Sequence, residues 1–547
     1  MSTGELNFAW AATIADVLVR RGVKHIALSP GSRSAPLALA FAERTELTVW
    51  PIPDERSAGF FALGVGMATG TPAALVVTSG TAGANAYPAV IEASLSNVPL
   101  VVVTANRPPE LHGFGALQTI EQHRLFGSYA EFVPLGVPEA GTAKHLRATI
   151  ARALSTATVV HLDVPFREPL ALAPGARLPA AFEGHERFEA ARPGAAHADV
   201  RVPARTVIVA GPARFSPAQR EAIAGLAERL QAPILAEASS GFRYGAHASH
   251  AVAHYDALLR VEPLRSELRP ELVIRVGGPL TTRTMQAFVD AHSVVAIAEP
   301  GRVCDPNHSA GVVLEGDPGL TAATLAATSP DPKWLARWQE LDARAAAAFE
   351  QQLSGEPAFA RSLVAALPAG ANLMLSNSMP IREVDAFASR SARALEVFAS
   401  RGASGIDGIT STAFGIAAAT GKKTALLVGD TALLHDVGGL VWGSRLKIPL
   451  CVVTLNNAGG RIFELLPVAQ STPRLGELFV MPPQVELKHA AALAGATYHD
   501  VRDAGHLGSA VREALEGGVH LVEVDARGRD LSEDHRRAWA AVAGAVQ

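Results

Sequence analysis

Val428-Gly429-Asp430 and, farther along the chain, Asn456-Asn457-Ala458-Gly459-Gly460 are the segments that decide the fold. Apolar runs precede both of them, Thr424 to Val428 before the first and Pro449 to Leu455 before the second. Each run is typical of a buried strand, and the residues between them are enough for a helix and a return. The carboxyl ends of parallel strands share one edge of a sheet, where open α/β folds bind ligands. A carboxylate and an amide oxygen at that edge suit a hard cation such as Mg²⁺.

This pair of segments also indicates a phosphate ligand. With so few protein oxygens, the other positions on the cation go to water and to phosphate oxygens, and the phosphate would belong to a cofactor. Thr431 and Ala432 begin the helix that follows, where backbone N–H groups and the helix dipole suit a diphosphate. The alternative is a capping Asp and a turn Asn, and a lone Gly-Asp is usually no more than that. The pair, with Gly459 and Gly460 behind it, favours a metal–diphosphate site.

Length and composition narrow the class of protein. The chain has 547 residues, of which 48% are hydrophobic and 18% are charged, values typical of a well-buried α/β enzyme. A net charge of −4 without a long basic run argues against nucleic acid as a partner. The two cysteines form no disulfide framework and no metal-type spacing. The N-terminus lacks a signal-peptide pattern and no apolar stretch reaches membrane-spanning length, so we expect a cytoplasmic protein without a membrane association.

Alternating strand and helix patterns predict an α/β fold of three domains, each a mainly parallel sheet flanked by helices. The expected domains are 1–175, 204–328 and 345–547. A linker rich in Ala, Pro and Gly runs from Pro174 to Pro203, and a second break falls at Thr328 to Pro332. Besides the two runs above, the expected strands are His25–Leu28, Leu47–Ile52, Ala73–Val77, Leu100–Thr104, Thr206–Ala210, Pro233–Ala236, Leu272–Val276 and Val294–Ala298.

Glu55 is the second feature that points to chemistry. It follows a strand and a short turn, and an apolar helical pattern from Ala58 to Ala68 comes after it. One interpretation is a first-turn Glu that complements the helix dipole. The other is a proton-transferring group whose surroundings raise its pKa.

Several motifs in order along the chain carry a family resemblance. Gly429-Asp430 with Asn456-Asn457 resembles the thiamine diphosphate signature, and Glu55 falls where that superfamily keeps its cofactor-activating Glu. Within the superfamily the chain resembles the MenD family, the 2-succinyl-5-enolpyruvyl-6-hydroxy-3-cyclohexene-1-carboxylate synthases of menaquinone biosynthesis. The resemblance spans the chain and is weakest in the middle. The further motifs that carry it are Ser29-Pro30-Gly31-Ser32-Arg33-Ser34-Ala35-Pro36-Leu37, Asp54-Glu55-Arg56, Ala105-Asn106-Arg107-Pro108, Gln118-Thr119 and Arg401-Gly402-Ala403-Ser404-Gly405-Ile406-Asp407-Gly408.

The resemblance implies a transferase that uses thiamine diphosphate and Mg²⁺, or Mn²⁺ in its place. Its reaction would decarboxylate 2-oxoglutarate and add the succinyl-semialdehyde carbanion equivalent to isochorismate in a 1,4-addition. Glu55 would protonate the aminopyrimidine N1′ of the cofactor. Asp430, the side-chain oxygen of Asn457 and the carbonyl of Gly459 would hold the cation, and Ile406 would wedge under the cofactor; Thr431, Ala432 and Gly460 complete the implied cofactor site.

Both implied substrates are dicarboxylates, so the site needs fixed cations, and Arg suits planar bidentate recognition of carboxylates. A single Arg is usually a solvated surface group, but several stand on matched motif positions. The implied catalytic residues are Glu55, Arg33, Gln118 and Ser32. The implied substrate-binding residues are Ser32, Arg33, Arg107, Gln118, Arg283, Asn377, Ser378, Arg382, Arg401, Ile462 and Phe463.

Two positions depart from the pattern. Arg283 stands where related sequences often have Lys, which keeps the charge but changes the geometry. Thr431-Ala432 replaces the Gly-Ser that follows Gly-Asp in much of the superfamily, so a backbone role survives but a serine contact does not. The resemblance also implies a homodimer or homotetramer with its active sites at the subunit interface.

Other interpretations remain open on the sequence alone. The nearest is another thiamine diphosphate enzyme, such as an acetohydroxyacid synthase or a 2-oxo acid decarboxylase. These enzymes handle monocarboxylates, so the several arginines argue against them, and the chain has no adjacent His pair. A binding protein that holds the cofactor without turnover is a second alternative. A nicotinamide dehydrogenase lacks support, because no Gly-x-Gly-x-x-Gly motif stands between a predicted strand and a helix. A serine hydrolase lacks support, because the chain has no Gly-x-Ser-x-Gly elbow.

Overall fold

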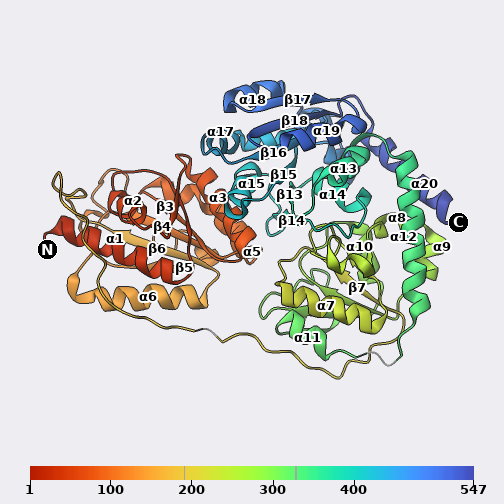
Figure 1. The fold of residues 1–547 in the computed structure, drawn as a ribbon, viewed down its shortest axis with the longest axis horizontal. Coiled ribbons are helices and arrows are strands. Elements are labelled where there is room, and N and C mark those ends of the chain that lie inside the picture. Colours follow the sequence, from red (N-terminus) through yellow and green to blue (C-terminus); the bar gives the residue numbers. More distant parts are fainter. Residues whose placement is uncertain (190, 327–328) are drawn as a thin grey trace. The chain divides into compact units, whose positions relative to one another are not determined.

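The structure, a computed structural model, describes residues 1–189, 191–326 and 329–547 (Figure 1). Three six-stranded sheets form its framework, and their paired strands all run parallel. Helices connect most of the consecutive strands, as is usual for parallel pairing. The predicted fold class, three mainly parallel α/β sheets flanked by helices, is confirmed.

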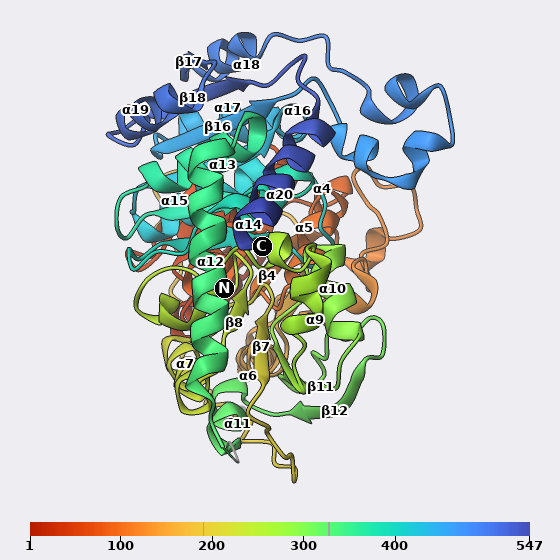
Figure 2. The same ribbon diagram turned by 90° about the vertical axis from the view of Figure 1, so that its right-hand side faces the viewer.

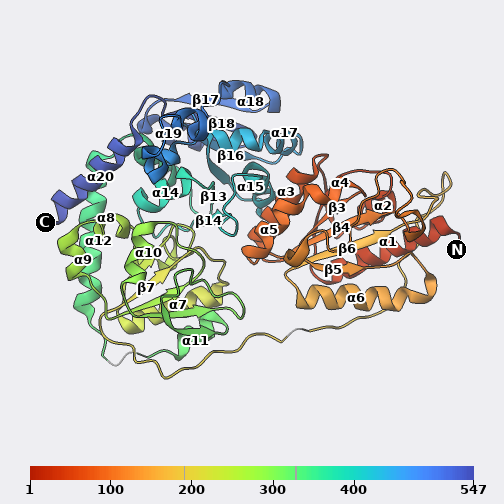
Figure 3. The same ribbon diagram turned by 180° about the vertical axis from the view of Figure 1, so that it is seen from behind.

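The first sheet has the strand order β2-β1-β3-β4-β6-β5. Its inner strands β3 and β4 are buried along their whole length, as expected of strands covered on both faces. One face packs against α1, α2 and α6 through an apolar cluster that includes Trp10, Phe41 and Ile150, and α3 lies against β1 and β3 (Figure 3). The elements are α1 (Thr3–Arg20), β1 (His25–Leu28), α2 (Ala35–Ala42), β2 (Thr48–Pro51), α3 (Glu55–Thr69), β3 (Ala73–Val77), α4 (Thr81–Asn85), α5 (Tyr87–Leu95), β4 (Leu100–Asn106), β5 (Glu131–Pro134), α6 (Ala143–Thr156) and β6 (Val159–Pro165).

Two later helices belong to the same compact unit as this sheet, namely α15 (Ile409–Thr420) and α17 (Val437–Arg445). Helix α15 crosses α3 with the two backbones in contact. A Cβ on Gly64 would lie 2.1 Å from the carbonyl oxygen of Thr412, and one on Gly415 would lie 2.1 Å from that of Phe61. Any larger residue at either glycine would push the helices apart. Gly64 therefore serves helix packing inside α3.

The second sheet has the order β12-β11-β10-β7-β8-β9. Two apolar clusters cover its faces. One joins β7 and β10 to α8, α10, α12 and α20, and the other joins them to α7 and α11. The elements are β7 (Thr206–Ala210), α7 (Pro217–Leu230), β8 (Ile234–Ala236), β9 (Ala251–Val252), α8 (Tyr255–Leu258), α9 (Glu262–Glu267), β10 (Leu272–Val276), α10 (Arg283–Asp290), β11 (Val294–Ala298), β12 (Ala310–Glu315), α11 (Pro318–Thr324), α12 (Pro332–Gln352) and α20 (Leu531–Val546).

The third sheet has the order β14-β13-β15-β16-β18-β17 and belongs to the same compact unit as the second. Helices α13, α14 and α19 contribute to its apolar core, which includes the buried Cys451. Figure 2 shows α12 and α20 side by side, and they are in contact. The remaining elements are α13 (Gly355–Ala366), β13 (Asn372–Leu375), α14 (Met379–Phe387), β14 (Glu396–Ala399), β15 (Thr424–Gly429), α16 (Asp430–His435), β16 (Leu450–Asn456), α18 (Leu487–Ala494), β17 (Thr497–Val501), α19 (Ala504–Ala514) and β18 (Val519–Asp525).

The predicted linker and breaks can be placed on this framework. The described residues between Pro174 and Pro203 form no helix and no named strand. Thr328, the start of the second predicted break, lies outside the described residues, and α12 begins at Pro332. The predicted start of the third domain, residue 345, falls within α12, whose Trp334 and Trp338 pack on the second sheet. The domain boundaries stay predictions.

The longest helices are α12, with 21 residues, and α1, with 18. Neither of these, nor any other helix in the described parts of the chain, is long and apolar enough to cross a membrane.

The buried His161 on β6 should make the first sheet sensitive to acid. Its ring contacts the Thr104 hydroxyl at 2.8 Å, and burial lowers the pKa of His161 to about 3 from 6.5. Below pH 6.5 the unfolded chain takes up a proton that the folded chain refuses, so this stability is present at neutral pH and is lost as the pH falls. In His161→Gln, which cannot titrate, the free energy of unfolding relative to wild type should gain about 1.4 kcal/mol per pH unit below 6.5.

Thermal unfolding of the two proteins between pH 7 and pH 4.5 measures this difference. His489→Gln is the control, because that side chain is 68% exposed. If His161→Gln and wild type lost stability in parallel as the pH fell, the proposed cause would be excluded.

Candidate active site

Asp430 lies where the sequence placed it, directly after β15. Strands β15 and β16 pair in parallel up to Gly429 and Leu455, so their carboxyl ends are adjacent. Helix α16 begins at Asp430 itself, one residue earlier than predicted. One carboxylate oxygen of Asp430 accepts hydrogen bonds from the backbone N–H and the hydroxyl of Thr431, and the other accepts from the N–H of Gly459 at 2.8 Å. The carboxylate is only 1% exposed, and burial raises the pKa of Asp430.

The segment after β16 brings two more oxygen donors to the same place. The side-chain nitrogen of Asn457 donates to Glu356 Oε1 at 2.8 Å, which leaves the side-chain oxygen of Asn457 available. Gly459 has a φ of +116°, and a Cβ there would lie 2.2 Å from the carbonyl oxygen of Val480, so only glycine fits. Its carbonyl accepts from the N–H of Arg461 at 2.8 Å and keeps a second lone pair. Asp430, Asn457 and Gly459 therefore form one group of hard oxygen donors.

These donors are unlike a dense metal cluster. In the described parts of the chain, no group of three or more His, Cys, Asp and Glu side chains is placed to hold a metal ion. A cation at Asp430 would rest on one carboxylate, one amide oxygen and one backbone carbonyl. Such a set suits Mg²⁺, which keeps few protein ligands and shares the rest of its sphere with phosphate and water.

Glu55 is the first residue of α3, as the sequence suggested. Asp54 caps this helix by accepting a hydrogen bond from the N–H of Ser57 at 3.1 Å. Glu55 is half-buried, and Asn85 donates to its Oε2 at 3.3 Å. The capped start fixes the backbone of Glu55, while its carboxyl group keeps hydrogen-bonding capacity for a ligand.

The first unit gathers Arg33, Arg107 and Gln118. Arg33 is 7% exposed and donates to the carbonyl of Phe166 at 2.9 Å. Arg107 donates to the Ser79 hydroxyl and to the backbone carbonyl of Gln118. Burial, together with the charge of Arg33, lowers the pKa of Arg107, so the two guanidinium groups act on each other. Two neighbouring cations of this kind attract a carboxylate.

Ser32 and Gln118 complete that group with polar side chains. Ser32 is exposed beside Arg33. Gln118 is exposed and has a φ of +54°, and its side-chain oxygen lies 3.5 Å from the Arg107 guanidinium.

A second group of cations forms in the other unit. Arg401 donates to Asn377 Oδ1 at 2.9 Å, and Arg382 donates to the carbonyl of Ser378 at 2.6 Å. Ser378 has a φ of +68° and precedes α14. Burial and the charge of Arg401 lower the pKa of Arg382. The charge of the exposed Arg283 lowers it further. The structure thus brings together four predicted residues and places Arg283 within electrostatic reach of them.

The three predicted apolar residues, Ile406, Ile462 and Phe463, lie on loops and a short turn. Ile406 is half-buried in the loop before α15. Ile462 and Phe463 lie on a short helical turn, η5 (Arg461–Leu465), which follows the Asn457 segment, and the ring of Phe463 packs 5.4 Å from that of Phe479.

Sequence reasoning missed several residues that support these groups. Ser79 follows a strand among polar residues that the sequence does mark, so a signal for it existed. Glu237 directly follows the predicted strand Pro233–Ala236, so the same signal existed for it, whereas Glu356 carries none. Glu237 is buried, accepts two hydrogen bonds from Thr281 and faces the charge of Arg401, and burial raises its pKa to about 8. Glu356 comes from a helix start that only the folded chain brings to Asn457.

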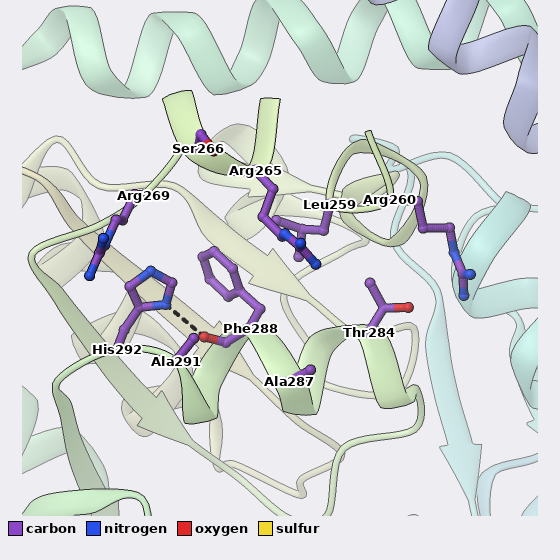
Figure 4. Close-up of a pocket in the computed structure, with 10 residues that line it drawn as sticks. All are labelled: Leu259, Arg260, Arg265, Ser266, Arg269, Thr284, Ala287, Phe288, Ala291 and His292. Atoms are coloured by element: carbon purple, nitrogen blue, oxygen red, sulfur yellow. Dashed lines mark hydrogen bonds between the residues drawn. The ribbon is translucent and has the colours of Figure 1, made fainter. Parts of the chain in front are cut away.

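A surface hollow of about 770 Å³ lies beside α9 and α10 and contains none of the predicted site residues (Figure 4). Phe288 forms part of its floor, and His292 bonds to the Phe288 carbonyl at 2.7 Å. Its Arg260 and Arg265 are already paired with Asp256 and Glu262.

Comparison with known families fits the architecture. Three family models match successive parts of the chain. These are the N-terminal TPP binding domain of thiamine pyrophosphate enzymes over residues 9–125, the middle domain of thiamine pyrophosphate over 189–375, and the C-terminal TPP binding domain over 387–524. The first includes Glu55 and the third includes Asp430 and Asn457.

A solved structure shares the fold. The X-ray structure of a protein from Mycobacterium smegmatis, described as a thiamin diphosphate-dependent enzyme, has a TM-score of 0.66 and 16% identity. The match covers 95% of this chain and 99% of that one.

Relatives along the whole chain carry one and the same name, 2-succinyl-5-enolpyruvyl-6-hydroxy-3-cyclohexene-1-carboxylate synthase. The protein of Myxococcus xanthus is 46% identical, with 100% of this chain and 99% of the relative covered. That of Chloroflexus aurantiacus is 38% identical, with 98% and 96% covered, and that of Geobacillus kaustophilus is 36% identical, with 98% and 97% covered. The chain therefore belongs to the 2-succinyl-5-enolpyruvyl-6-hydroxy-3-cyclohexene-1-carboxylate synthase family of thiamine pyrophosphate enzymes.

Proposed function

We propose that this protein uses thiamine diphosphate and Mg²⁺ to decarboxylate 2-oxoglutarate and to add the resulting four-carbon unit to isochorismate in menaquinone biosynthesis. The observation that carries the proposal is the oxygen donor group of Asp430, Asn457 and Gly459 at the ends of two paired strands, in a chain whose relatives carry the name of this synthase.

The donor group fits a divalent cation that bridges to a diphosphate. Burial alone raises the pKa of Asp430, and a cation beside it would favour the ionised form instead. Because the side-chain nitrogen of Asn457 donates to Glu356, only the side-chain oxygen of Asn457 can bind the cation. The backbone N–H of Ala432, near the start of α16, would suit a diphosphate in the same region, whereas the N–H of Thr431 already donates to Asp430. Mg²⁺, or Mn²⁺ in its place, is the cation we propose.

Thiamine diphosphate, when bound, supplies the carbanion chemistry by which a 2-oxo acid loses carbon dioxide and its acyl carbon becomes a nucleophile. The task of Glu55 is to exchange a proton with the N1′ nitrogen of the aminopyrimidine ring. Its place at a capped helix start holds the carboxyl group in position for that exchange. Ile406, Ile462 and Phe463 provide apolar surface for the cofactor and substrates.

The two arginine groups explain a preference for dicarboxylates. Arg33 and Arg107, with Ser32 and Gln118, form one cationic surface, and Arg382 and Arg401, with Asn377 and Ser378, form another. In each group like charges act on each other within a partly buried setting, so a bound carboxylate relieves their repulsion. Arg283 adds to the second group.

Removal of one of these cations should weaken substrate use more than cofactor binding. In Arg401→Ala, kcat/KM for 2-oxoglutarate or isochorismate should fall about 10- to 100-fold, the loss expected of a hydrogen bond to a charged group. Arg401→Lys should recover only part, because Lys lacks the planar fork. Arg512→Ala, an exposed change on α19, is the control. Steady-state kinetics that matched wild type in Arg401→Ala would remove this residue from the site.

The test of the function is isochorismate consumption by the purified protein with 2-oxoglutarate, thiamine diphosphate and Mg²⁺, each omitted in turn. Consumption only in the complete mixture supports the proposal. Release of carbon dioxide without loss of isochorismate would assign a different acceptor, and no reaction in the complete mixture would overturn the proposed activity.

The active sites are proposed to lie at the interface of a homodimer or homotetramer. Closed symmetric assemblies are the usual form of soluble oligomers. Glu55 and Asp430 belong to different compact units of the chain, which allows different subunits to supply them.

A further inference from the structure

We propose that Glu356 is a positioning residue that fixes which end of the Asn457 amide faces the cation. This inference rests on the proposed function, because it concerns the cation site at Asp430. Glu356 belongs to no sequence motif of the site and comes from the start of α13, about a hundred residues before Asn457.

An amide has one end that can bind a cation and one that cannot. Its oxygen is a ligand for Mg²⁺, whereas its NH₂ group only donates hydrogen bonds. The Asn457 nitrogen donates to Glu356 Oε1 at 2.8 Å, and the two residues are 7% and 4% exposed. Turning the amide over would place NH₂ toward the cation and oxygen against oxygen, unless the acid carried a proton on that atom. The Glu356 acceptor therefore selects the orientation that binds a cation.

The neighbouring Asn456 shows the contrast. Its nitrogen donates to Glu523 Oε1 at 2.6 Å, and its oxygen accepts from the N–H of Ala458 at 3.3 Å. Both ends of the Asn456 amide are thus used inside the protein, and Tyr498 holds Glu523 from the other side at 2.7 Å. Asn457 has the same kind of acidic partner for its nitrogen but keeps its oxygen for a ligand. The Asn-Asn pair divides into a structural residue and a ligand residue.

Glu356 is held in place by the start of its helix. Gly355 has a φ of +63°, and a Cβ there would lie 2.1 Å from Asp534 Oδ2, so the chain enters α13 by a turn that only glycine makes. Ser354 donates to Asp534 at 2.8 Å, which ties this turn to α20. Behind Glu356, Glu383 pairs with His535 at 2.7 Å.

The fold gains little from Glu356 itself. Among the described residues, Asn457 is the hydrogen-bond partner of its Oε1, and its buried Oε2 has none. A buried carboxyl group with one oxygen unpartnered is costly, and the charge of the nearby Glu383 adds to that cost. Replacement of buried charged groups by well-packed apolar residues is often neutral or stabilising. This cost is consistent with a role toward the ligand.

The experiment measures cofactor binding rather than turnover. Isothermal titration calorimetry of the apoprotein with thiamine diphosphate, at several Mg²⁺ concentrations, should show a 10- to 100-fold loss of affinity in Glu356→Leu, the range found for residues that orient metal ligands. Glu356→Gln keeps an acceptor oxygen and should stay within about threefold of wild type. The apoprotein of Glu356→Leu should melt within a few degrees of wild type. Unchanged affinity in Glu356→Leu, or equal losses in both variants, would overturn the inference.

A double-mutant cycle separates action through Asn457 from a general disturbance. If Glu356 works through Asn457, then Glu356→Leu should add little to the loss that Asn457→Ala already causes. Multiplied losses in the double variant would contradict the inference. The wild-type titrations test the underlying proposal separately, because cofactor binding that ignored Mg²⁺ in wild type would remove the cation site itself.

Discussion

Glu55→Gln is expected to lose nearly all turnover, with kcat lowered about 10²- to 10⁴-fold, the contribution of a positioned acid or base, while thiamine diphosphate still binds. Glutamine keeps the shape of the side chain and an oxygen that can accept from Asn85, so the start of α3 should be unchanged. What it loses is the proton that the carboxyl group exchanges with the cofactor. Steady-state kinetics and a calorimetric titration with the cofactor measure the two effects separately.

The two measurements distinguish a role of Glu55 in the chemistry from a role in the stability of α3. If Glu55 only stabilised the helix dipole, kcat would be near wild type and the melting temperature would change instead. Glu43→Gln is a suitable control, because Glu43 is an exposed carboxylate at the end of α2 in the same unit. A kcat in Glu55→Gln close to that of the control would remove Glu55 from the chemistry.

The sequence predicts most inner strands of the three sheets but misses the inner strands β6, β13 and β18, and of the edge strands in the described residues it predicts β2 alone. Five of the ten predicted strands, such as Ala73–Val77, have the bounds that the structure gives, and the other five differ by one or two residues at an end. Inner strands are buried on both faces and read as continuous apolar runs. Edge strand β12 is largely exposed, and the run of edge strand β17 is broken by polar residues such as His499. These edges carry no periodic signal strong enough to predict a strand.

The residues of the candidate site also differ in how far the sequence alone predicts them. Residues at strand ends or helix starts, such as Asp430, Asn457 and Glu55, could be found from local pattern, because open parallel sheets bind ligands at the carboxyl ends of their strands. Asp430 and Asn457 follow neighbouring strands of the third sheet, whereas Glu55 follows a strand of the first. The roles of Arg401 and Arg107 came from family motifs. Glu356 could not be found by either route, since its meaning depends on a contact with Asn457 that links distant segments. Side chains that orient other side chains are visible only once the chain is folded.

Asp430→Ala is expected to lower Mg²⁺-dependent affinity for thiamine diphosphate by more than about 100-fold, beyond the usual loss for a residue that only supports a ligand. The change removes the single carboxylate of the donor group, and it also leaves the N–H groups of Gly459 and Thr431 without their acceptor. Asp430→Asn keeps an acceptor oxygen but loses the charge. Its affinity for thiamine diphosphate should lie between that of Asp430→Ala and that of wild type. Asp500→Ala, at a partly exposed carboxylate, is the control. Calorimetric affinity equal to wild type in Asp430→Ala would exclude the proposed ligand.

The same two variants test whether the active site is shared between subunits. If Glu55 of one subunit acts with Asp430 of another, a mixed dimer of Glu55→Gln and Asp430→Ala contains one site with both changes and one site with neither. Random mixing by unfolding and refolding, or by coexpression, should then restore about a quarter of wild-type activity, because half of the dimers are mixed and each has one intact site. If one subunit supplies both residues, every site carries a change and the mixture stays inactive. Recovery of activity from two inactive proteins would therefore establish the shared site, and an inactive mixture, with mixed dimers shown by mass spectrometry, would place both residues in one subunit's site.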